Sequence, residues 1–122
     1  PADRCLEERA APASPAPLIG MLFDAAVAAL TRAEGLQRSA MFNEACAPLI
    51  KAQDIVLELR CSLNAEAGEL ATALDALYSY AHQRLVHANV KRDHAAITEV
   101  IGIIDPLRVA WRESCLRVAV AG

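Results

Sequence analysis

Four segments of the chain carry apolar residues at alternating spacings of three and four, which is the period of an amphipathic α-helix. They run over about residues 15–38, 43–63, 69–90 and 94–120. No strand-like alternation competes with this period, so the pattern predicts an all-α protein, an antiparallel up-down four-helix bundle. The expected buried faces are Leu18, Leu22, Ala25, Ala29, Ala33 and Leu36 in the first segment; Leu49, Ala52, Val56, Leu59 and Leu63 in the second; Leu70, Leu74, Leu77, Ala81, Leu85 and Ala88 in the third; and Ile97, Val100, Ile104, Leu107, Trp111 and Val118 in the fourth.

The N-terminal part of the chain differs in composition from the rest. Three prolines lie within residues 11–17, and proline excludes regular helix there. Ser14 followed by Pro15 is typical of a helix start, with serine as the N-cap and proline at the first helical position. We therefore expect an irregular arm over residues 1–14 and a bundle domain over residues 15–122.

Short polar stretches separate the last three segments. Residues 64–68 begin with Asn64 and end with Gly68, two residue types that tolerate the left-handed conformation at helix ends. Residues 91–93 end with Asp93, which we expect to cap the last helix. Loops this short predict that neighbouring helices run antiparallel.

Composition narrows the classes of partner. Of the 122 residues, 55% are hydrophobic but only 4% are aromatic, so the excess is alanine and leucine, which favour closely packed helices. The net charge of −3, without a stripe of Lys and Arg, argues against nucleic acid and anionic membranes as partners. No apolar run approaches the roughly 20 residues that cross a bilayer, so membrane insertion is not expected.

Signatures of catalytic and metal sites are absent from the sequence. There is no glycine-rich phosphate loop, no G-x-S-x-G motif, no C-x-x-C pair among the four cysteines, and no Glu followed three residues later by His. His82 and His87 are five positions apart, and on a helix they diverge by more than a pair of metal ligands tolerates. We expect no enzymatic activity, no metal and no cofactor.

The second and fourth segments hold more apolar residues than one buried face needs. This surplus indicates either a surface that a partner peptide, a second copy of the chain or the N-terminal arm covers part of the time, or simply a wider core. Periodicity alone does not decide between them. The surplus residues are Ile50, Ile55 and Leu57 in the second segment and Ile101, Ile103 and Val109 in the fourth.

Several stretches together are similar to one known family. Ser14-Pro15 is followed by Leu22-Phe23-Asp24, residues 50–64 read IKAQDIVLELRCSLN, residues 68–93 read GELATALDALYSYAHQRLVHANVKRD, and ITEV and LRVAW follow at 97–100 and 107–111. Over about residues 14–114 the chain resembles the flagellar secretion chaperones of the FliS family. The combination of KAQDI, L-x-x-S-L-N, LYxY and RLxxAN at these spacings is specific.

The resemblance implies an antiparallel four-helix bundle that acts in the cytoplasm. Such a chaperone binds the disordered C-terminal segment of flagellin, prevents premature polymerisation and escorts the subunit to the type III export gate. Two other classes stay open from the residues alone. One is a self-associating helical-bundle adaptor or regulator with a different client, which would form a homodimer, and the other is a thiol-based redox or metal protein.

The resemblance also implies where the flagellin segment binds. It places the partner-binding residues on the second and third helices: Ile50, Gln53, Asp54, Leu57, Ala71, Leu74, Tyr78, Ala81, Arg84, Leu85 and Asn89. Core packing competes with this role at Leu74 and Leu85. Members of the family usually carry a tyrosine in the N-terminal arm, whereas the first tyrosine here is Tyr78. Pro48 and Pro106 within helical segments are a second departure.

Overall fold

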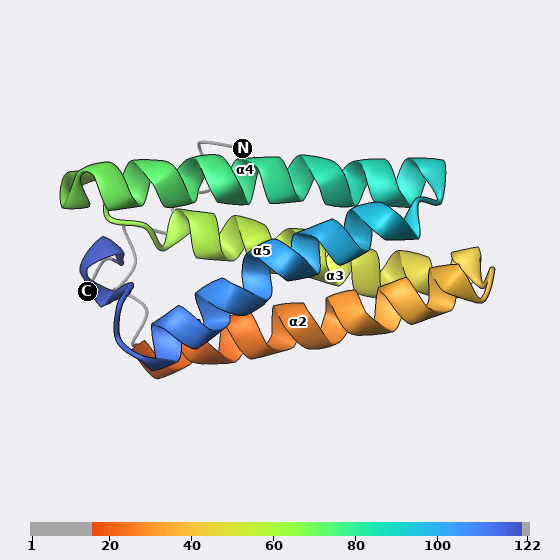
Figure 1. Cartoon of the computed structure of the whole chain (residues 1–122), viewed down its shortest axis with the longest axis horizontal. Helices are drawn as coiled ribbons and strands as arrows, with labels where there is room; N and C mark the ends of the chain where they lie inside the picture. The colour runs from red at the N-terminus through yellow and green to blue at the C-terminus, as the bar shows by residue number, and fades with distance from the viewer. Residues whose placement is uncertain (1–15, 121–122) are drawn as a thin grey trace.

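The computed structural model describes residues 16–120, which form four long helices (Figure 1). They are α2 (Ala16–Arg38), α3 (Phe42–Cys61), α4 (Glu69–Lys91) and α5 (His94–Arg112). Consecutive helices run in opposite directions, so the chain passes up and down the bundle. The prediction of an all-α four-helix bundle is confirmed. Ser14 and Pro15, the expected helix start, lie outside the described residues.

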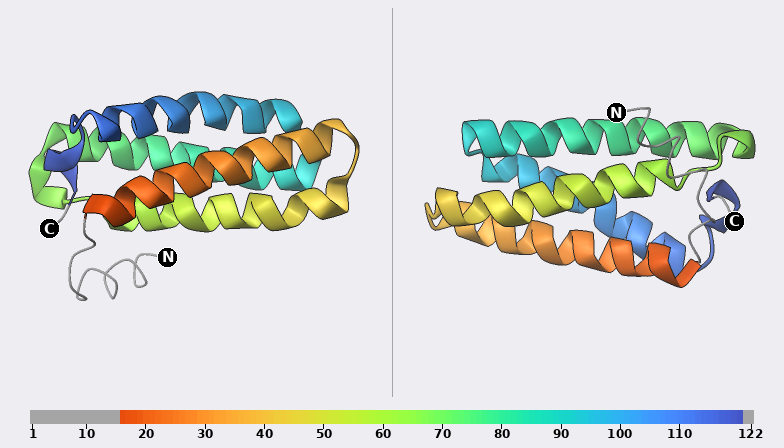
Figure 2. Two further views of the ribbon diagram at one scale, coloured as in Figure 1. Left: turned by 90° about the horizontal axis from the view of Figure 1, so that it is seen from below. Right: turned by 180° about the vertical axis from the view of Figure 1, so that it is seen from behind.

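The helices pack in a closed cycle (Figures 1 and 2). α2 packs against α3 and α5, and α4 packs against the same two helices. α5 crosses the bundle obliquely, from the C-terminal end of α4 to the N-terminal end of α2. No described helix combines the length and the hydropathy that crossing a membrane requires.

The expected connection over residues 64–68 and the Asp93 cap are confirmed. Asn64 Oδ1 accepts a hydrogen bond from the Glu66 amide and opens a short 3-10 turn, Ala65–Ala67. Gly68 follows with φ of 75°, where a residue with a Cβ would be strained. Asp93 Oδ1 accepts from the Ala95 amide at 3.1 Å and caps α5.

The buried face of α3 agrees with the sequence pattern, whereas that of α2 agrees at Ala29 and Ala33 and is shifted by one residue at its other positions. All five predicted residues around α3 are buried, from Leu49 to Leu63. On α2 the core holds Ile19 and Phe23, each 1% exposed, while Leu18 is 40% exposed. Apolar residues occur on α2 as adjacent pairs, so two faces fit the helical period equally well. The positions of α3 and α5 decide which of the two is buried.

The last helix ends earlier than the pattern predicts. α5 stops at Arg112, and Ser114 adopts a left-handed conformation with φ of 67°. The Ser114 amide donates to the Trp111 carbonyl and the Cys115 amide donates to the Ala110 carbonyl, which is the hydrogen-bond pattern of a Schellman cap. The helical prediction to residue 120 was therefore wrong.

The segment after α5 turns back over the end of the bundle. A second 3-10 turn, η2 (Arg117–Ala119), follows Leu116, and both Leu116 and Ala119 are buried. The Asn64 amide donates to the Ala119 carbonyl at 2.8 Å, which ties this segment to the connection between α3 and α4. Val118, expected on the buried face, is 72% exposed. The chain reversal at Ser114 breaks the helical phase that the prediction assumed.

Candidate partner-binding surface

One line of side chains along α3 is only partly covered by the bundle. Ile50, Gln53, Asp54 and Leu57 recur at helical spacing, so they share a face. Ile50 is 50% exposed, Asp54 is exposed, and Gln53 and Leu57 are half-buried. The family resemblance alone had predicted these four residues, and the helix brings all four together.

Two polar contacts locate this line on the side of α3 that borders α4. Near the start of α3, Cys46 Sγ lies 3.4 Å from Asn89 Oδ1 and donates to it. Near its end, Arg60 Nε donates to Asp75 Oδ1 at 2.6 Å. Ile50 follows Cys46 by four positions and Leu57 precedes Arg60 by three, so each contact lies one helical turn from an end of the line. The α3 line therefore runs along the boundary with α4, between the two contacts.

The matching line on α4 shares its helical face with Asn89. Val86 and His82 precede Asn89 by three and seven positions, so they share its face. Val86 is 40% exposed, and His82 and Asn89 are half-buried. We call the residues on both sides of this boundary the α3–α4 surface: Ile50, Gln53, Asp54 and Leu57 on α3, with His82, Val86 and Asn89 on α4.

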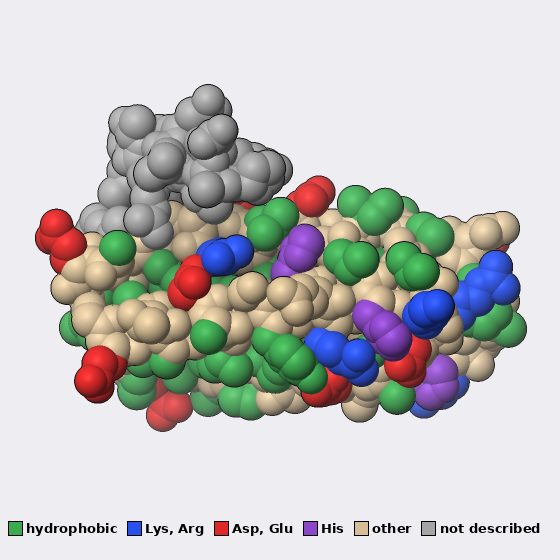
Figure 3. All heavy atoms as spheres, turned by 90° about the horizontal axis from the view of Figure 1, so that it is seen from above, with side chains coloured by type: hydrophobic (Ala, Val, Ile, Leu, Met, Phe, Trp, Pro, Cys, Tyr) green, Lys and Arg blue, Asp and Glu red, His purple; other side chains and the backbone are tan. Residues whose placement is uncertain are grey.

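The α3–α4 surface mixes apolar and polar groups. Burial lowers the pKa of His82, with a smaller lowering by the Arg60 charge and an opposing effect of the Asp54 carboxylate. The imidazole is therefore neutral at physiological pH, and its two ring nitrogens then offer one donor and one acceptor. Figure 3 looks down on α4 and shows hydrophobic side chains interspersed with histidine and single charges. Such a surface suits a partner that presents both apolar and polar side chains.

Most of the residues predicted on α4 lie elsewhere. Five of them point into the bundle and are at most 3% exposed, so they support the surface from beneath: Ala71, Leu74, Tyr78, Ala81 and Leu85. Arg84 faces α5, where its Nε donates to Glu99 Oε1 at 2.7 Å, and Tyr80 donates to the same carboxylate. Of the seven α4 predictions, Asn89 alone lies on the α3–α4 surface.

Sequence reasoning missed His82 and Val86 although the signal was present. Their spacing from Asn89 is helical, so the sequence alone places them on the same face of α4 as Asn89. Leu77 was predicted in the core but is 39% exposed. Tyr78 was predicted to be half-buried but is 3% exposed. Burial of Tyr78 raises the pKa of its hydroxyl, which stays neutral.

The surplus apolar residues divide between the two interpretations. Ile55 is 7% exposed and widens the core, while Ile50 and Val109 remain half exposed. Leu57, Ile101 and Ile103 are intermediate. The surplus is thus part core and part surface.

The described residues show no grouping of metal ligands, and two of their cysteines carry free thiols. Within residues 16–120, no group of three or more His, Cys, Asp or Glu side chains is placed to hold a metal ion. The free thiols of Cys46 and Cys115 lie at opposite ends of the bundle, near the start of α3 and after the end of α5 (Figure 1). The Cys46 thiol lies 3.4 Å both from the Phe42 carbonyl within α3 and from Asn89 Oδ1 on α4, so its one proton is shared between these acceptors where the two helices pack.

Comparison with known proteins gives a consistent result. Residues 1–118 match the sequence model of the family described as flagellar protein FliS. The flagellar secretion chaperone FliS of Salmonella typhimurium is 40% identical over 103 residues, covering 83% of this chain and 76% of the relative. The protein of the same name from Escherichia coli is 39% identical over 106 residues, covering 85% of this chain and 78% of the relative. That of Bacillus subtilis is 42% identical over 66 residues, so the match spans about half of each chain, 54% and 49%.

Proposed function

The chain belongs to the FliS family of flagellar secretion chaperones, and on that premise we propose that it binds the disordered C-terminal segment of flagellin in the cytoplasm. In this role it keeps flagellin from polymerising prematurely and escorts it to the type III export gate. The names of the relatives support a role in flagellar secretion. The client and the gate are our proposal.

The observation that carries the proposal is the α3–α4 surface. Ile50, Leu57 and Val86 offer apolar area on both sides of a boundary between two helices. An amphipathic helix docks on such a surface through anchors one turn apart. A disordered segment that gains this helix on binding also satisfies its own backbone hydrogen bonds, so the surface needs to supply few of them.

The polar groups of the α3–α4 surface fit the same occupant. The amides of Gln53 and Asn89 each offer a donor and an acceptor, and the Asp54 carboxylate accepts only. Asn89 and Cys46 are already bonded to each other, so this end of the surface is fixed before a partner arrives. A surface held in place in this way costs less ordering entropy on binding.

Calorimetric titration with the C-terminal segment of flagellin from the same organism tests the proposal. We expect one-to-one binding in the micromolar range or tighter, a negative heat-capacity change, and a gain of helix by circular dichroism. Ile50→Asp should weaken binding because it buries a carboxylate under the partner. Met21→Asp is the matched control, since Met21 is 65% exposed on α2, which packs on the far side of the bundle from α4.

Two outcomes would redirect the proposal. If the folded chain gives no heat with the flagellin segment at two temperatures, the client is a different protein. Sedimentation equilibrium would then test the self-associating class. In that class the mass rises with concentration, and Ile50→Asp lowers it to that of a single chain.

A secretion assay tests the escort to the export gate separately. In cells that lack this chaperone, the wild-type chain should restore flagellin in the medium and Ile50→Asp should restore less. Equal restoration by both, with binding shown to be weakened, would uncouple export from the α3–α4 surface.

A further inference from the structure

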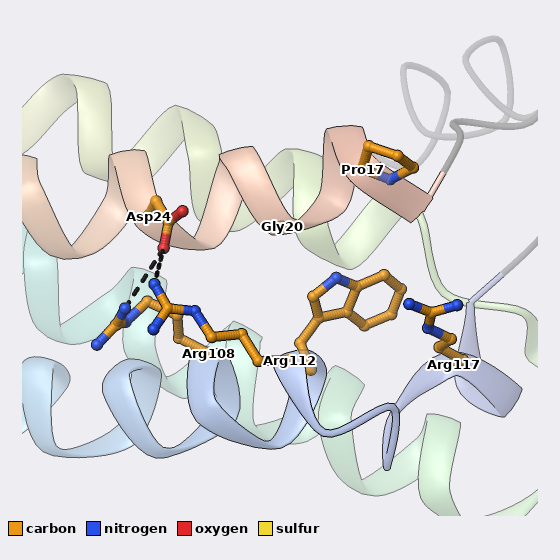
Figure 4. A pocket seen from close by; sticks show the side chains of 7 residues that line it. Pro17, Gly20, Asp24, Arg108, Arg112 and Arg117 are labelled. Carbon is orange, nitrogen blue, oxygen red and sulfur yellow. Dashed lines mark hydrogen bonds and ion pairs between the residues drawn. The ribbon is translucent and has the colours of Figure 1, made fainter.

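A pocket of about 340 Å³ opens between α2 and α5, near the start of α2 and the end of α5 (Figure 4). Because α2 and α5 lie across the bundle from the boundary of α3 and α4, the pocket is separate from the α3–α4 surface. Its lining residues are Pro17, Gly20, Asp24, Arg108, Trp111, Arg112 and Arg117.

The charge of the lining is unbalanced, with three guanidinium groups and one carboxylate. Asp24 Oδ1 accepts from Arg112 at 3.4 Å and from Arg108 at 3.5 Å, both at the long limit for a hydrogen bond. Arg108 is held more closely by Asp105, at 2.8 Å. Arg112 therefore keeps most of its donor capacity, since a guanidinium carries five N–H groups.

Arg117 adds a second guanidinium group that has N–H donors available for a ligand. Its central carbon lies 5.9 Å from the Trp111 ring, a cation–π contact, and no carboxylate among residues 16–120 pairs with it. In Figure 4 it stands on one side of the indole, and Arg112 and Arg108 stand on the other. The pocket thus has positive groups on both sides of an aromatic wall.

Trp111 supplies that wall and one further donor. The indole is 6% exposed and packs against Phe23, with ring centroids 6.3 Å apart. Its nitrogen is turned toward Gly20, and a Cβ at that position would lie 3.4 Å from it. Glycine therefore leaves room beside the indole N–H, for which no acceptor is found among the described residues.

We propose that this pocket binds a carboxylate on an acidic peptide segment of a partner. The Arg112 guanidinium pairs with the carboxylate, the Trp111 indole N–H donates to it, and Arg117 adds a positive charge on the other side of the indole. Asp24 is an internal competitor, because it engages two of the arginines when the pocket is empty. An apolar wall beside the cations favours an organic acid over an inorganic anion.

Trp111 is the only tryptophan of the chain, so its indole N–H resonance reports on this pocket alone. The full chain would be titrated with acetyl-Ala-Leu-Glu-Leu-Ala-amide and with the matched peptide that has Gln in place of Glu. We expect a saturable shift of the indole resonance with the first peptide and none with the second. A third peptide, the Gln form with a free C-terminal carboxylate, shows whether the main chain can supply the acid.

Variants with effects of opposite sign sharpen the test. Arg112→Gln should weaken binding of the Glu peptide about tenfold, the effect of losing a hydrogen bond to a charged group. Arg117→Gln should weaken it less, because it removes a nearby positive charge but no hydrogen bond to the carboxylate. Asp24→Asn should strengthen it, because the competing carboxylate is removed. Arg38→Gln is the control, since Arg38 is exposed at the other end of α2 and pairs with Glu34.

Three results would overturn the proposal. The first is an equal shift of the indole resonance with the Glu and Gln amide peptides. The second is a shift with inorganic phosphate but with neither carboxylate peptide. The third is weaker binding of the Glu peptide after Asp24→Asn in a chain whose circular dichroism is unchanged. A shift with either carboxylate peptide that Arg112→Gln reduces would support it and identify the source of the acid.

Discussion

Leu116 and Val118 lie two residues apart in the segment after α5, and they should differ sharply in their contribution to stability. Leu116 is 7% exposed where the segment turns over the end of the bundle, whereas Val118 is 72% exposed. We predict that Leu116→Ala destabilises the protein and that Val118→Ala does not. The pair tests the observed end of α5, because a helix continued to residue 120 would bury Val118.

The expected magnitude follows from the burial of each side chain. A fully buried Leu→Ala change costs about 2–5 kcal/mol, partly from lost transfer free energy and partly from the cavity left behind. Leu116 lies at the end of the bundle, where neighbouring residues can move into the space, so we expect about 2–3 kcal/mol. Val118→Ala removes exposed methyl groups and should change the free energy of unfolding by about 0.5 kcal/mol or less.

Urea unfolding of both variants gives the measurement, followed by far-UV circular dichroism and by the fluorescence of Trp111. The midpoint should fall for Leu116→Ala with an unchanged m-value, which shows that the folded state keeps its compactness. Equal losses for the two variants, or a larger loss for Val118→Ala, would refute the placement of this segment.

Three further predictions concern α2, α3 and α4. Ile50→Ala should weaken binding of the flagellin segment by about 4- to 12-fold, because covering the exposed half of an isoleucine is worth ~0.8–1.5 kcal/mol. Leu85→Ala, by contrast, should lower the free energy of unfolding by ~2–5 kcal/mol, and a stability loss of that size for Ile50→Ala would contradict its surface position. Tyr78→Phe should leave the free energy of unfolding unchanged at neutral pH and should reduce the fall in that free energy at alkaline pH. Because burial raises the pKa of Tyr78, the unfolded state releases the hydroxyl proton first as pH rises through about 10. The contribution of Tyr78 to the free energy of unfolding is therefore present below that pH and lost above it. Identical dependence of stability on alkaline pH in the wild-type and Tyr78→Phe proteins would argue against this. Ala40→Gly should raise the unfolding midpoint by relieving ~1 kcal/mol of strain, since Ala40 follows the end of α2 with φ of 60°. A lower midpoint would show that the strain is absent.

The number of helices, their order and most of their ends were predictable from local patterns along the chain. Helix formation depends on contacts three and four residues apart and on local caps such as Asp93, and both involve only residues that are near in sequence. The face of α3 was also predictable, because Leu49, Ala52 and Val56 follow a single helical line. The family motifs likewise identified the four α3 residues of the α3–α4 surface.

The tertiary structure alone decided which of several apolar faces is buried. On α2, Leu18 and Ile19 are neighbours and both fit the helical period, and on α4 the same holds for Leu77 and Tyr78. No glycine or asparagine immediately follows the end of α5 at Arg112, so the sequence did not predict the left-handed residue at Ser114. This helix end forms where Leu116 and Ala119 can cover the end of the bundle, and that gain depends on α3 and α4.

The α3–α4 surface and the α2–α5 pocket have the same origin. Val86 and Asn89 join Ile50 in one surface only because α4 packs beside α3, and Asp24 meets Arg112 only because α5 crosses back to the start of α2. These residues are far apart in sequence, so no local pattern encodes their meeting. Burial and helix–helix packing bring them together, and both depend on the whole chain.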